Sequence, residues 1–427
     1  MKLWEKGINT DQLIEDFTVG NDRILDIHLA KYDVLASVAH AKMLGSIGIL
    51  TEAEVNQLLS GLSLLNEQIE NGTFQIEEGF EDVHSKIEYE LTQQLGDVGK
   101  KIHTGRSRND QVLVCMHLYI KNEIDEIKKS IKDLFVLLIK LSHKHKEVLI
   151  PGYTHLQAAM PSSFGLWFGA YAESLIDDLH LLNAAYNIAD QNPLGSAAGY
   201  GSSFPLDRTM TTELLDFSTL KYNSIAAQMS RGKVEKTTSY ALASVASTLA
   251  KISMDVTLYM NENFGFISFP DALTTGSSIM PHKKNPDVFE LMRAKCNKIQ
   301  NLPNELMSIT NNLPSGYHRD LQLVKESFIP AVESMKSCLE LATFSLAQIQ
   351  VNKENSASKM HDTLYTVESI NDHIKDGMPF RDAYREVADS IAKGNYVPQK
   401  NIHHTHEGSI GNLCNEEIVE KFNGVFG

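Results

Sequence analysis

The sequence has few of the residues and segments that mark several large classes of protein. Its 427 residues include only four cysteines, which form no CxxC pair and no zinc-site spacing: Cys115, Cys296, Cys338 and Cys414. So sparse a set excludes a disulfide scaffold and favours reduced thiols in a cytoplasmic protein. The N-terminal stretch MKLWEKGINTDQ lacks the apolar run of a signal peptide, and no apolar stretch predicts a membrane span.

Positive charge is also scarce. Lysine and arginine number 39 against 54 aspartates and glutamates, which gives a net charge of −15 at pH 7. This balance argues against a nucleic-acid surface and against binding to anionic membranes. An anionic substrate must therefore be attracted by a local group of basic residues. With 42% hydrophobic and 22% charged residues, the chain is typical of a soluble globular protein of two or three domains.

No segment shows the sustained apolar–polar alternation of strands, so a major sheet is not expected. Helical spacing is abundant instead. The clearest case is a seam of apolar residues alternately four and three apart: Ile120, Ile124, Ile127, Ile131, Leu134, Leu138 and Leu141. This heptad pattern is typical of long helices packed nearly parallel. A second long helix is expected from about Arg231 to Asn263, and the predicted fold class is all-α.

Shorter helices are expected before residue 105. Thr51 and Glu54 have the spacing of a capping box at a helix start. His84 lies near the start of a later helix, and taken alone it is interpreted as a surface or capping histidine rather than a catalytic one.

The stretch TTGSSIMPHKKNPDVFE, residues 274–290, carries the strongest functional signal. Its glycine, serines, prolines and paired lysines cannot pack as core. Asn285 suits a helix N-cap, and Pro286 suits the first helical position. Two hydroxyls and two lysines beside a helix N-terminus predict an anion site with a candidate proton acceptor. The alternative is a lysine-bearing surface loop before a capped helix.

Two further strings hold candidate site residues. Arg106 and Arg108 in HTGRSRNDQ, residues 103–111, either form a solvated face or hold carboxylates bidentately. Thr154 and His155 lie in GYTHLQ, residues 152–157, within a short connection. A loop histidine is usually just solvated, but its titration near neutral pH suits a general acid or base if a site surrounds it.

Together these strings resemble the motifs of the fumarase/aspartase superfamily of lyases, which eliminate fumarate from a succinyl-bearing substrate. Residues 276–286 resemble its GSSxMPxKxNP signature, and residues 317–325 resemble its YxxDLQxxK segment. HTGRSRNDQ and GYTHLQ are closer to the forms found in the argininosuccinate lyase family than to those of fumarases or adenylosuccinate lyases. The resemblance runs from residue 2 to about residue 384.

The resemblance implies an all-α, three-domain fold with a central bundle of long helices, assembled as a homotetramer. The expected divisions are an N-terminal helical domain at 1–105, the bundle at 106–354 and a small helical domain at 355–427. The implied reaction is reversible cleavage of argininosuccinate to arginine and fumarate, without a metal or an organic cofactor. Two alternatives stay open: a sister lyase such as adenylosuccinate lyase, and an inactive structural relative like some lens crystallins.

The resemblance also assigns roles to residues. Ser277 occupies the position of the base, and Lys283 would stabilise its anion and the dianion formed from substrate. His155 is the candidate acid for the departing guanidinium nitrogen, oriented by Glu290. The residues expected to bind the substrate are Arg108, Asn109, Thr154, Arg231, Asn285, Tyr317, Gln322 and Lys325.

Two features depart from the family pattern. Asp22 stands where the family commonly has a serine that binds a substrate carboxylate; a carboxylate there could instead face a guanidinium. The C-terminal region is shorter than usual and ends differently, and its histidines His403, His404 and His406 are interpreted as a solvated loop rather than a metal site.

The motifs are expected to meet only between subunits. Each lies at or near an end of a long helix, and a helix of about 30 residues spans about 45 Å. Motifs at opposite ends of one chain's bundle therefore cannot easily meet, whereas antiparallel packing of neighbouring chains would bring different ends together. The family has this arrangement, so the resemblance implies sites shared between subunits.

Overall fold

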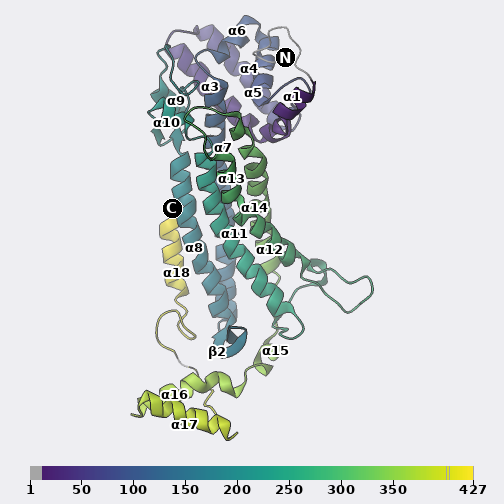
Figure 1. Cartoon of the computed structure of the whole chain (residues 1–427), viewed down its shortest axis with the longest axis vertical. Helices are drawn as coiled ribbons and strands as arrows, with labels where there is room; N and C mark the ends of the chain where they lie inside the picture. The colour runs from purple at the N-terminus through teal and green to yellow at the C-terminus, as the bar shows by residue number, and fades with distance from the viewer. Residues whose placement is uncertain (1–11, 401, 403, 427) are drawn as a thin grey trace. The chain divides into compact units, whose positions relative to one another are not determined.

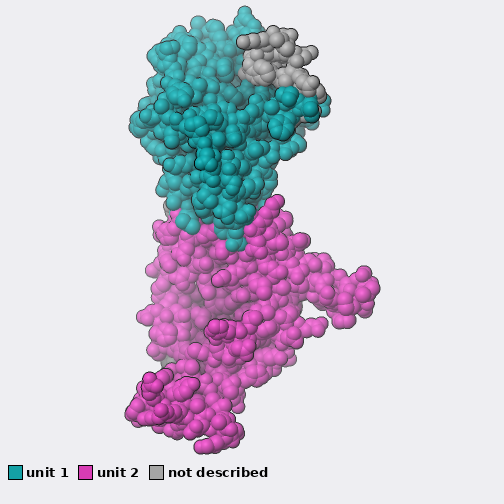
Figure 2. All heavy atoms as spheres, viewed as in Figure 1, with its two compact units in different colours: residues 1–126, 181–243, 299–334 teal, residues 127–180, 244–298, 335–427 magenta. Residues whose placement is uncertain are grey.

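The computed structural model describes residues 12–400, 402 and 404–426, and these are mainly helical, as predicted (Figure 1). The chain forms two compact units, shown in two colours in Figure 2. Unit 1 holds residues 1–126, 181–243 and 299–334, and unit 2 holds residues 127–180, 244–298 and 335–427. Each unit thus joins segments that are far apart in the sequence. The three-domain division stays a prediction.

Unit 1 is built mainly from short helices: α1 (Gln12–Val19), α2 (Asp22–Leu25), α3 (Ala30–Ser46), α4 (Glu52–Glu70), α5 (Val83–Leu95), α6 (Asp97–Lys100), α9 (Arg208–Leu214), α10 (Ser224–Gln228) and α13 (Leu302–Thr310). Its 3-10 turns are η1 (Asp26–Leu29), η2 (Lys101–His103) and η4 (Arg319–Gln322). The strands β3 (Gln191–Asn192) and β4 (Thr219–Leu220) pair in parallel.

The longer helices contribute residues to both units: α7 (Arg108–His145), α8 (Phe164–Ala189), α11 (Lys233–Met260), α12 (Asp287–Gln300) and α14 (Val324–Leu346). The predicted heptad seam lies on α7, and all seven of its side chains are at most 4% exposed. Local sequence also defines helix starts, since Thr51 and Glu54 make the capping box predicted before α4.

Unit 2 contains α15 (Lys353–Ser358), α16 (Thr366–Lys375), α17 (Phe380–Ala392), α18 (Asn415–Phe426), η3 (Asp271–Leu273) and η5 (Asp362–Tyr365). Two antiparallel pairs of strands complete it: β1 (Leu149–Thr154) with β2 (Gln157–Ser163), and β5 (Ile267–Ser268) with β6 (Gln350–Val351). No sheet among the described residues has more than two strands, as the sequence predicted.

Aromatic packing and buried polar contacts hold unit 2 together. Trp167 Nε1 and Tyr171 Oη on α8 both donate hydrogen bonds to Asp255 of α11, at 2.9 and 2.7 Å. Helix α18 packs on α7, where the rings of Phe135 and Phe422 stack with centroids 3.8 Å apart. Burial of such rings is worth several kcal/mol of unfolding free energy, on the order of 3 for truncation to alanine.

The small core of the C-terminal helices is separate from those contacts. It consists of Ile370 on α16 with Ala383 and Val387 on α17, covered by Met378 and Tyr396. Three buried residues thus form the core between these two helices.

Helix α11 qualifies the expectation that no apolar stretch reaches membrane-spanning length. Among the described helices, it alone meets that standard by length and composition, with a mean hydropathy of 1.2 over its best window, of which 44% is buried. Small residues with buried faces, such as Ala241, Ala246 and Ser253, are typical of a core helix in a helical bundle.

Candidate active site

A cavity of about 380 Å³ in unit 1 brings half of the predicted site residues together. Its walls come from α2, η1, the segment before α5, the start of α7, Arg231, and the segment that leads into α14. Six of the predicted residues line it: Arg108, Asn109, Arg231, Tyr317, Gln322 and Lys325. The other six belong to unit 2 and do not line this cavity.

Lys325 lies at one wall of this cavity between two carboxylates. Its Nζ atom is 2.6 Å from Asp26 Oδ1 and 2.9 Å from Asp22 Oδ1, and none of the three side chains is more than 9% exposed. Although burial opposes its charge, Asp26 and Asp22 hold the pKa of Lys325 above its ordinary value. Burial raises the pKa of Asp22 to about 6, against the attraction of Lys325. The residue at the usual serine position is therefore part of an ion cluster.

Arg108 is held by the start of α5. Its Nη1 donates to Asp82 Oδ2, and its Nη2 donates to Ser85 Oγ at 3.2 Å. Asp82 is also the N-cap of α5, because its Oδ1 accepts the backbone N–H of Ser85 at 2.9 Å. One carboxylate thus fixes both a helix start and the orientation of a predicted substrate-binding arginine.

The segment that leads into α14 is tied to the N-terminal helices. Gln322 Nε2 donates to the carbonyl oxygens of Thr18 and Val19 at 2.9 and 3.1 Å. Arg319 Nη2 donates to Thr18 O and lies 2.5 Å from Glu81 Oε1. These bonds fix the wall on which Tyr317 lies.

Arg231 precedes α11 and is only 7% exposed. Its Nη2 donates to Leu321 O at 3.5 Å, and its Nε is 3.8 Å from Glu235 Oε1. Burial raises the pKa of Glu235, which the Arg231 charge opposes. The guanidinium of Arg231 therefore contacts the carboxylate of Glu235, which does not line the cavity.

The glycine-serine segment 192–207 is positioned by the first motif. Asp110 Oδ2 accepts the backbone N–H groups of Gly195 and Ala197, each at 3.0 Å, and its Oδ1 accepts the N–H of Ser107 at 2.8 Å. Asp110 is fully buried, and burial raises its pKa to about 6. This small-residue loop is thereby docked against the start of α7.

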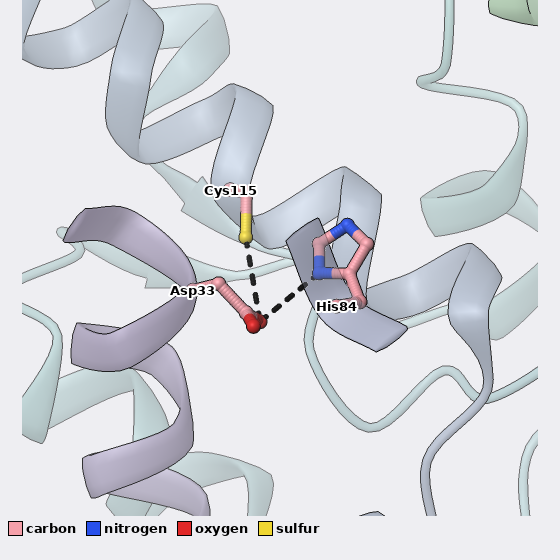
Figure 3. Close-up of side chains that lie close together, drawn as sticks. All are labelled: Asp33, His84 and Cys115. Carbon is pink, nitrogen blue, oxygen red and sulfur yellow. Dashed lines mark hydrogen bonds and ion pairs between the residues drawn. The ribbon is translucent and has the colours of Figure 1, made fainter. Parts of the chain in front are cut away.

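Near Arg106 and Arg108, a fully buried cluster of side chains joins three helices (Figure 3). Asp33 of α3 lies 3.2 Å from His84 Nδ1 of α5 and 3.9 Å from the Cys115 sulfur of α7. The prediction of a surface or capping position for His84 is wrong, since His84 is only 2% exposed. These donor types could in principle ligate a metal ion. However, burial raises the pKa of the Cys115 thiol, which favours a thiol that donates to Asp33 over a metal-binding thiolate.

In unit 2, Thr154 and His155 lie at the tip of the β1–β2 hairpin, where Thr154 pairs with Gln157. The two residues between them, His155 and Leu156, have φ angles of 55° and 59°. Positive φ at both central residues is the geometry of a tight two-residue turn, and it is costly for residues other than glycine. The hairpin defines the backbone at His155, whose side chain is exposed.

The 274–286 loop is closed at its base by backbone hydrogen bonds between Thr275 and Asn285, with Asn285 N donating to Thr275 O at 2.9 Å. Ser277 Oγ accepts the backbone N–H groups of Ile279 and Met280, at 3.3 and 3.1 Å. The Lys283 side chain is exposed. Helix α12 begins at Asp287, one residue beyond the predicted start.

The roles assigned to His155 and Glu290 stay predictions. Both side chains are exposed, and no hydrogen bond or ion pair joins them among the described residues of one chain. His403 lies outside the described residues. His404 is not simply solvated: its Nε2 is 3.0 Å from Glu368 Oε1, and its Nδ1 is 2.7 Å from Ser409 Oγ. Both ring nitrogens are thus engaged by the protein.

The sequence reasoning missed four residues of the cavity as site groups, namely Asp26, Glu81, Asp82 and Arg319. Asp26 follows Asp22 by four residues, a spacing that places two side chains of a helical segment on one face. Asp82 carries no local signal of a site role, since its contact with Arg108 joins residues 26 positions apart.

Comparison with known proteins shows the family of the chain. A family model described as a lyase matches residues 5–301. An argininosuccinate lyase of Parabacteroides distasonis is 56% identical over 426 residues, covering 100% of this chain and 96% of the relative. One from Thermotoga neapolitana is 40% identical over 392 residues, covering 92% of this chain and 98% of the relative.

Two solved structures share the fold. A structure titled as EDDS lyase in complex with formate has a TM-score of 0.78 at 20% identity, covering 98% of this chain and 91% of that chain. A class II fumarase from Schistosoma mansoni has a TM-score of 0.75 at 17% identity, covering 97% and 93%. The chain therefore belongs to the lyase family of the fumarase/aspartase superfamily. Within that family it is one of the argininosuccinate lyases, which match it along its full length.

Proposed function

We propose that the chain catalyses the reversible elimination of fumarate from argininosuccinate, releasing arginine. The observation that carries this proposal is the mixed charge of the unit 1 cavity. Five cationic side chains line it together with four carboxylates: Arg106, Arg108, Arg231, Arg319 and Lys325, and Asp22, Asp26, Glu81 and Asp82. Cationic groups suit substrate carboxylates, and carboxylates suit a guanidinium or an ammonium group. Argininosuccinate carries all of these groups, whereas malate, the substrate of a fumarase, carries no cation.

The first step would be removal of a proton from the carbon beside a carboxylate by Ser277. The electron pair of the broken C–H bond moves into that carboxylate, which becomes a dianion. A serine is a weak base unless its anion is stabilised. The N–H groups of Ile279 and Met280 point at Ser277 Oγ and would stabilise the alkoxide, with Lys283 supplying charge for the dianion.

The second step would break the bond between carbon and the guanidinium nitrogen. The electron pair of the dianion returns to form the double bond of fumarate, and the leaving nitrogen takes a proton. His155 is the proposed donor, with Glu290 orienting its ring. The tight hairpin turn defines the backbone at His155 and leaves its side chain exposed, which suits a group that acts on substrate bound to another chain.

We further propose that the active protein is a homotetramer with shared sites. The unit 1 cavity is lined by residues of unit 1 alone, so that it offers binding groups but none of the proposed proton-transfer groups. Other copies of the chain would supply Thr154 and His155, and Ser277, Lys283 and Asn285. The net charge of −15 supports a cytoplasmic enzyme without nucleic-acid or membrane partners.

One assay tests this function. Purified protein is incubated with argininosuccinate, and fumarate formation is followed by its ultraviolet absorbance. Adenylosuccinate serves as the matched substrate of a sister lyase. We expect turnover of argininosuccinate only. Turnover of adenylosuccinate would favour the sister lyase, and no turnover of either substrate would favour an inactive structural relative.

A further inference from the structure

A second cavity of unit 1 is not used by the proposed reaction. It has a volume of about 320 Å³ and lies between the end of α10, the start of α11 and the segment 310–316. Arg231 is the one residue that lines both this cavity and the substrate cavity. We call it the α11 pocket.

The α11 pocket is cationic in a strongly acidic protein. Arg231, Lys233 and Lys236 line it, and no carboxylate of the described residues does. The Lys233 charge also lowers the pKa of nearby Lys221, after the larger effect of burial, so positive charge extends beyond the lining residues. The 28-residue helix α11 begins at Lys233, which adds the positive end of its dipole.

A buried amide in the same pocket has no partner. Gln228 lines the pocket and is 1% exposed, and neither Oε1 nor Nε2 makes a hydrogen bond among the described residues. Buried side-chain amides are almost always hydrogen-bonded. The two unpaired atoms of the Gln228 amide therefore indicate that a partner is missing. Glycine at position 199 lets the backbone approach this side chain closely, since a Cβ there would lie 2.9 Å from Gln228 Cβ.

The backbone at the start of α11 shapes the pocket, but its first N–H groups are not free to bind a ligand. Gly232 has a φ of 77°, and a Cβ there would lie 2.7 Å from Thr310, so that only glycine lets the pocket wall approach so closely. The N–H groups of Lys233 and Val234 already donate to Ser230 O, both at 3.0 Å. A ligand would therefore be bound by the two lysines, Arg231 and the Gln228 amide.

We propose that the α11 pocket binds a small doubly charged oxyanion, either phosphate or a short dicarboxylate. Lys233 and Lys236 supply charge-assisted hydrogen bonds, and Gln228 Nε2 supplies the neutral donor. Because Arg231 is shared, an anion in the α11 pocket draws its guanidinium away from the substrate cavity and weakens substrate binding. Only this second, coupling part rests on the proposed function.

Calorimetric titration of the full-length protein with inorganic phosphate, and separately with succinate, tests the binding. The double variant Lys233→Gln/Lys236→Gln should bind at least about tenfold more weakly, since each charge-assisted bond is worth roughly that factor. Gln228→Met should also weaken binding, with its fold checked by thermal unfolding. Lys251→Gln is the matched control, because it removes an exposed lysine of the same helix outside the pocket.

Tighter binding of phosphate than of succinate assigns the pocket to phosphate-type ligands. Tighter binding of succinate assigns it to dicarboxylates, which then bind here as well as in the substrate cavity. Equal affinity of the wild type and the double variant for both anions would overturn the proposal, as would no binding at millimolar concentrations. The coupling is tested by the KM for argininosuccinate, which phosphate should raise in the wild type and not in the double variant. If the protein does not turn over argininosuccinate, the result of the anion titrations still stands, because these titrations do not depend on turnover.

Discussion

Lys325 Nζ lies 2.9 Å from Asp22 Oδ1, at a position where the family commonly places a serine. With Asp26 on its other side, the lysine charge is matched by two buried carboxylates before any substrate enters. When Asp22 is ionised, the three side chains carry one net negative charge, which the charge of nearby Arg231 offsets.

Replacement of Asp22 by asparagine should stabilise the protein in a pH-dependent way. Because burial raises the Asp22 pKa to about 6 from 3.8, ionising it in the folded state is unfavourable. Its contribution to stability is therefore fully present below pH 3.8 and is lost as the pH rises through 6. Thermal unfolding should show a gain in Tm for Asp22→Asn that is larger at pH 8 than at pH 4.5. An equal or reversed difference would contradict the cluster's electrostatics.

Replacement of Ser277 by alanine should remove most of the turnover and leave the fold intact. The residue lies in an exposed loop, so its loss costs no core packing, whereas loss of a general base lowers kcat by roughly 10²- to 10⁴-fold. Steady-state kinetics measures the effect, and Ser278→Ala, the exposed neighbour, is the control that should stay near wild type. A normal kcat for Ser277→Ala would remove the residue from the role of base.

Substitutions of the adjacent residues Lys283 and Lys284 should have clearly different effects on kcat. Lys283→Met should lower kcat by about 10²-fold or more, because it removes a charge that stabilises the dianion. Lys284→Met is its control, since Lys284 instead pairs with Asp271 within the loop. If Lys283→Met raises KM alone, Lys283 binds substrate and transition state equally.

Buried His117 should make the protein sensitive to acid. Its Nδ1 lies 2.7 Å from Ala189 O and its Nε2 lies 3.2 Å from Ser230 Oγ, and burial lowers its pKa to about 4. A depressed histidine pKa gives stability that is present above pH 6.5 and lost as the pH falls toward 4, up to on the order of 3 kcal/mol.

Denaturant unfolding between pH 7 and pH 4 checks this. His117→Gln should be less stable at pH 7 but should lose less on acidification than the wild type. Exposed His180→Gln should follow the wild-type curve. Parallel curves for His117→Gln and the wild type would show that another group causes the acid sensitivity.

Mixed tetramers should test the shared sites. Ser277→Ala and His155→Asn homotetramers should each be nearly inactive. When the two are unfolded and refolded together, some sites should draw every motif from undamaged chains and recover a measurable fraction of wild-type activity. Verified hybrid tetramers that remain inactive would sink the shared-site proposal.

Features that depend on neighbours along the chain could be predicted from the amino-acid order. The heptad seam from Ile120 to Leu141 predicted a long buried face, and Thr51 with Glu54 predicted a helix start, because helical period and capping act within a few residues. The strings around Ser277, His155 and Arg108 likewise identified the family from local order alone.

Contacts between groups far apart in the chain became visible once the folded structure was known. Lys325 and Asp26 are 299 positions apart, and nothing local to either one indicates that they form an ion pair. His84 was misplaced at the surface because its partner Asp33 and the covering Cys115 come from two other helices. Asp110 holds Gly195 and Ala197 from 85 and 87 residues away, which no pattern near either segment signals. Burial and ion pairing are properties of the packed chain, and they set the charges of the site.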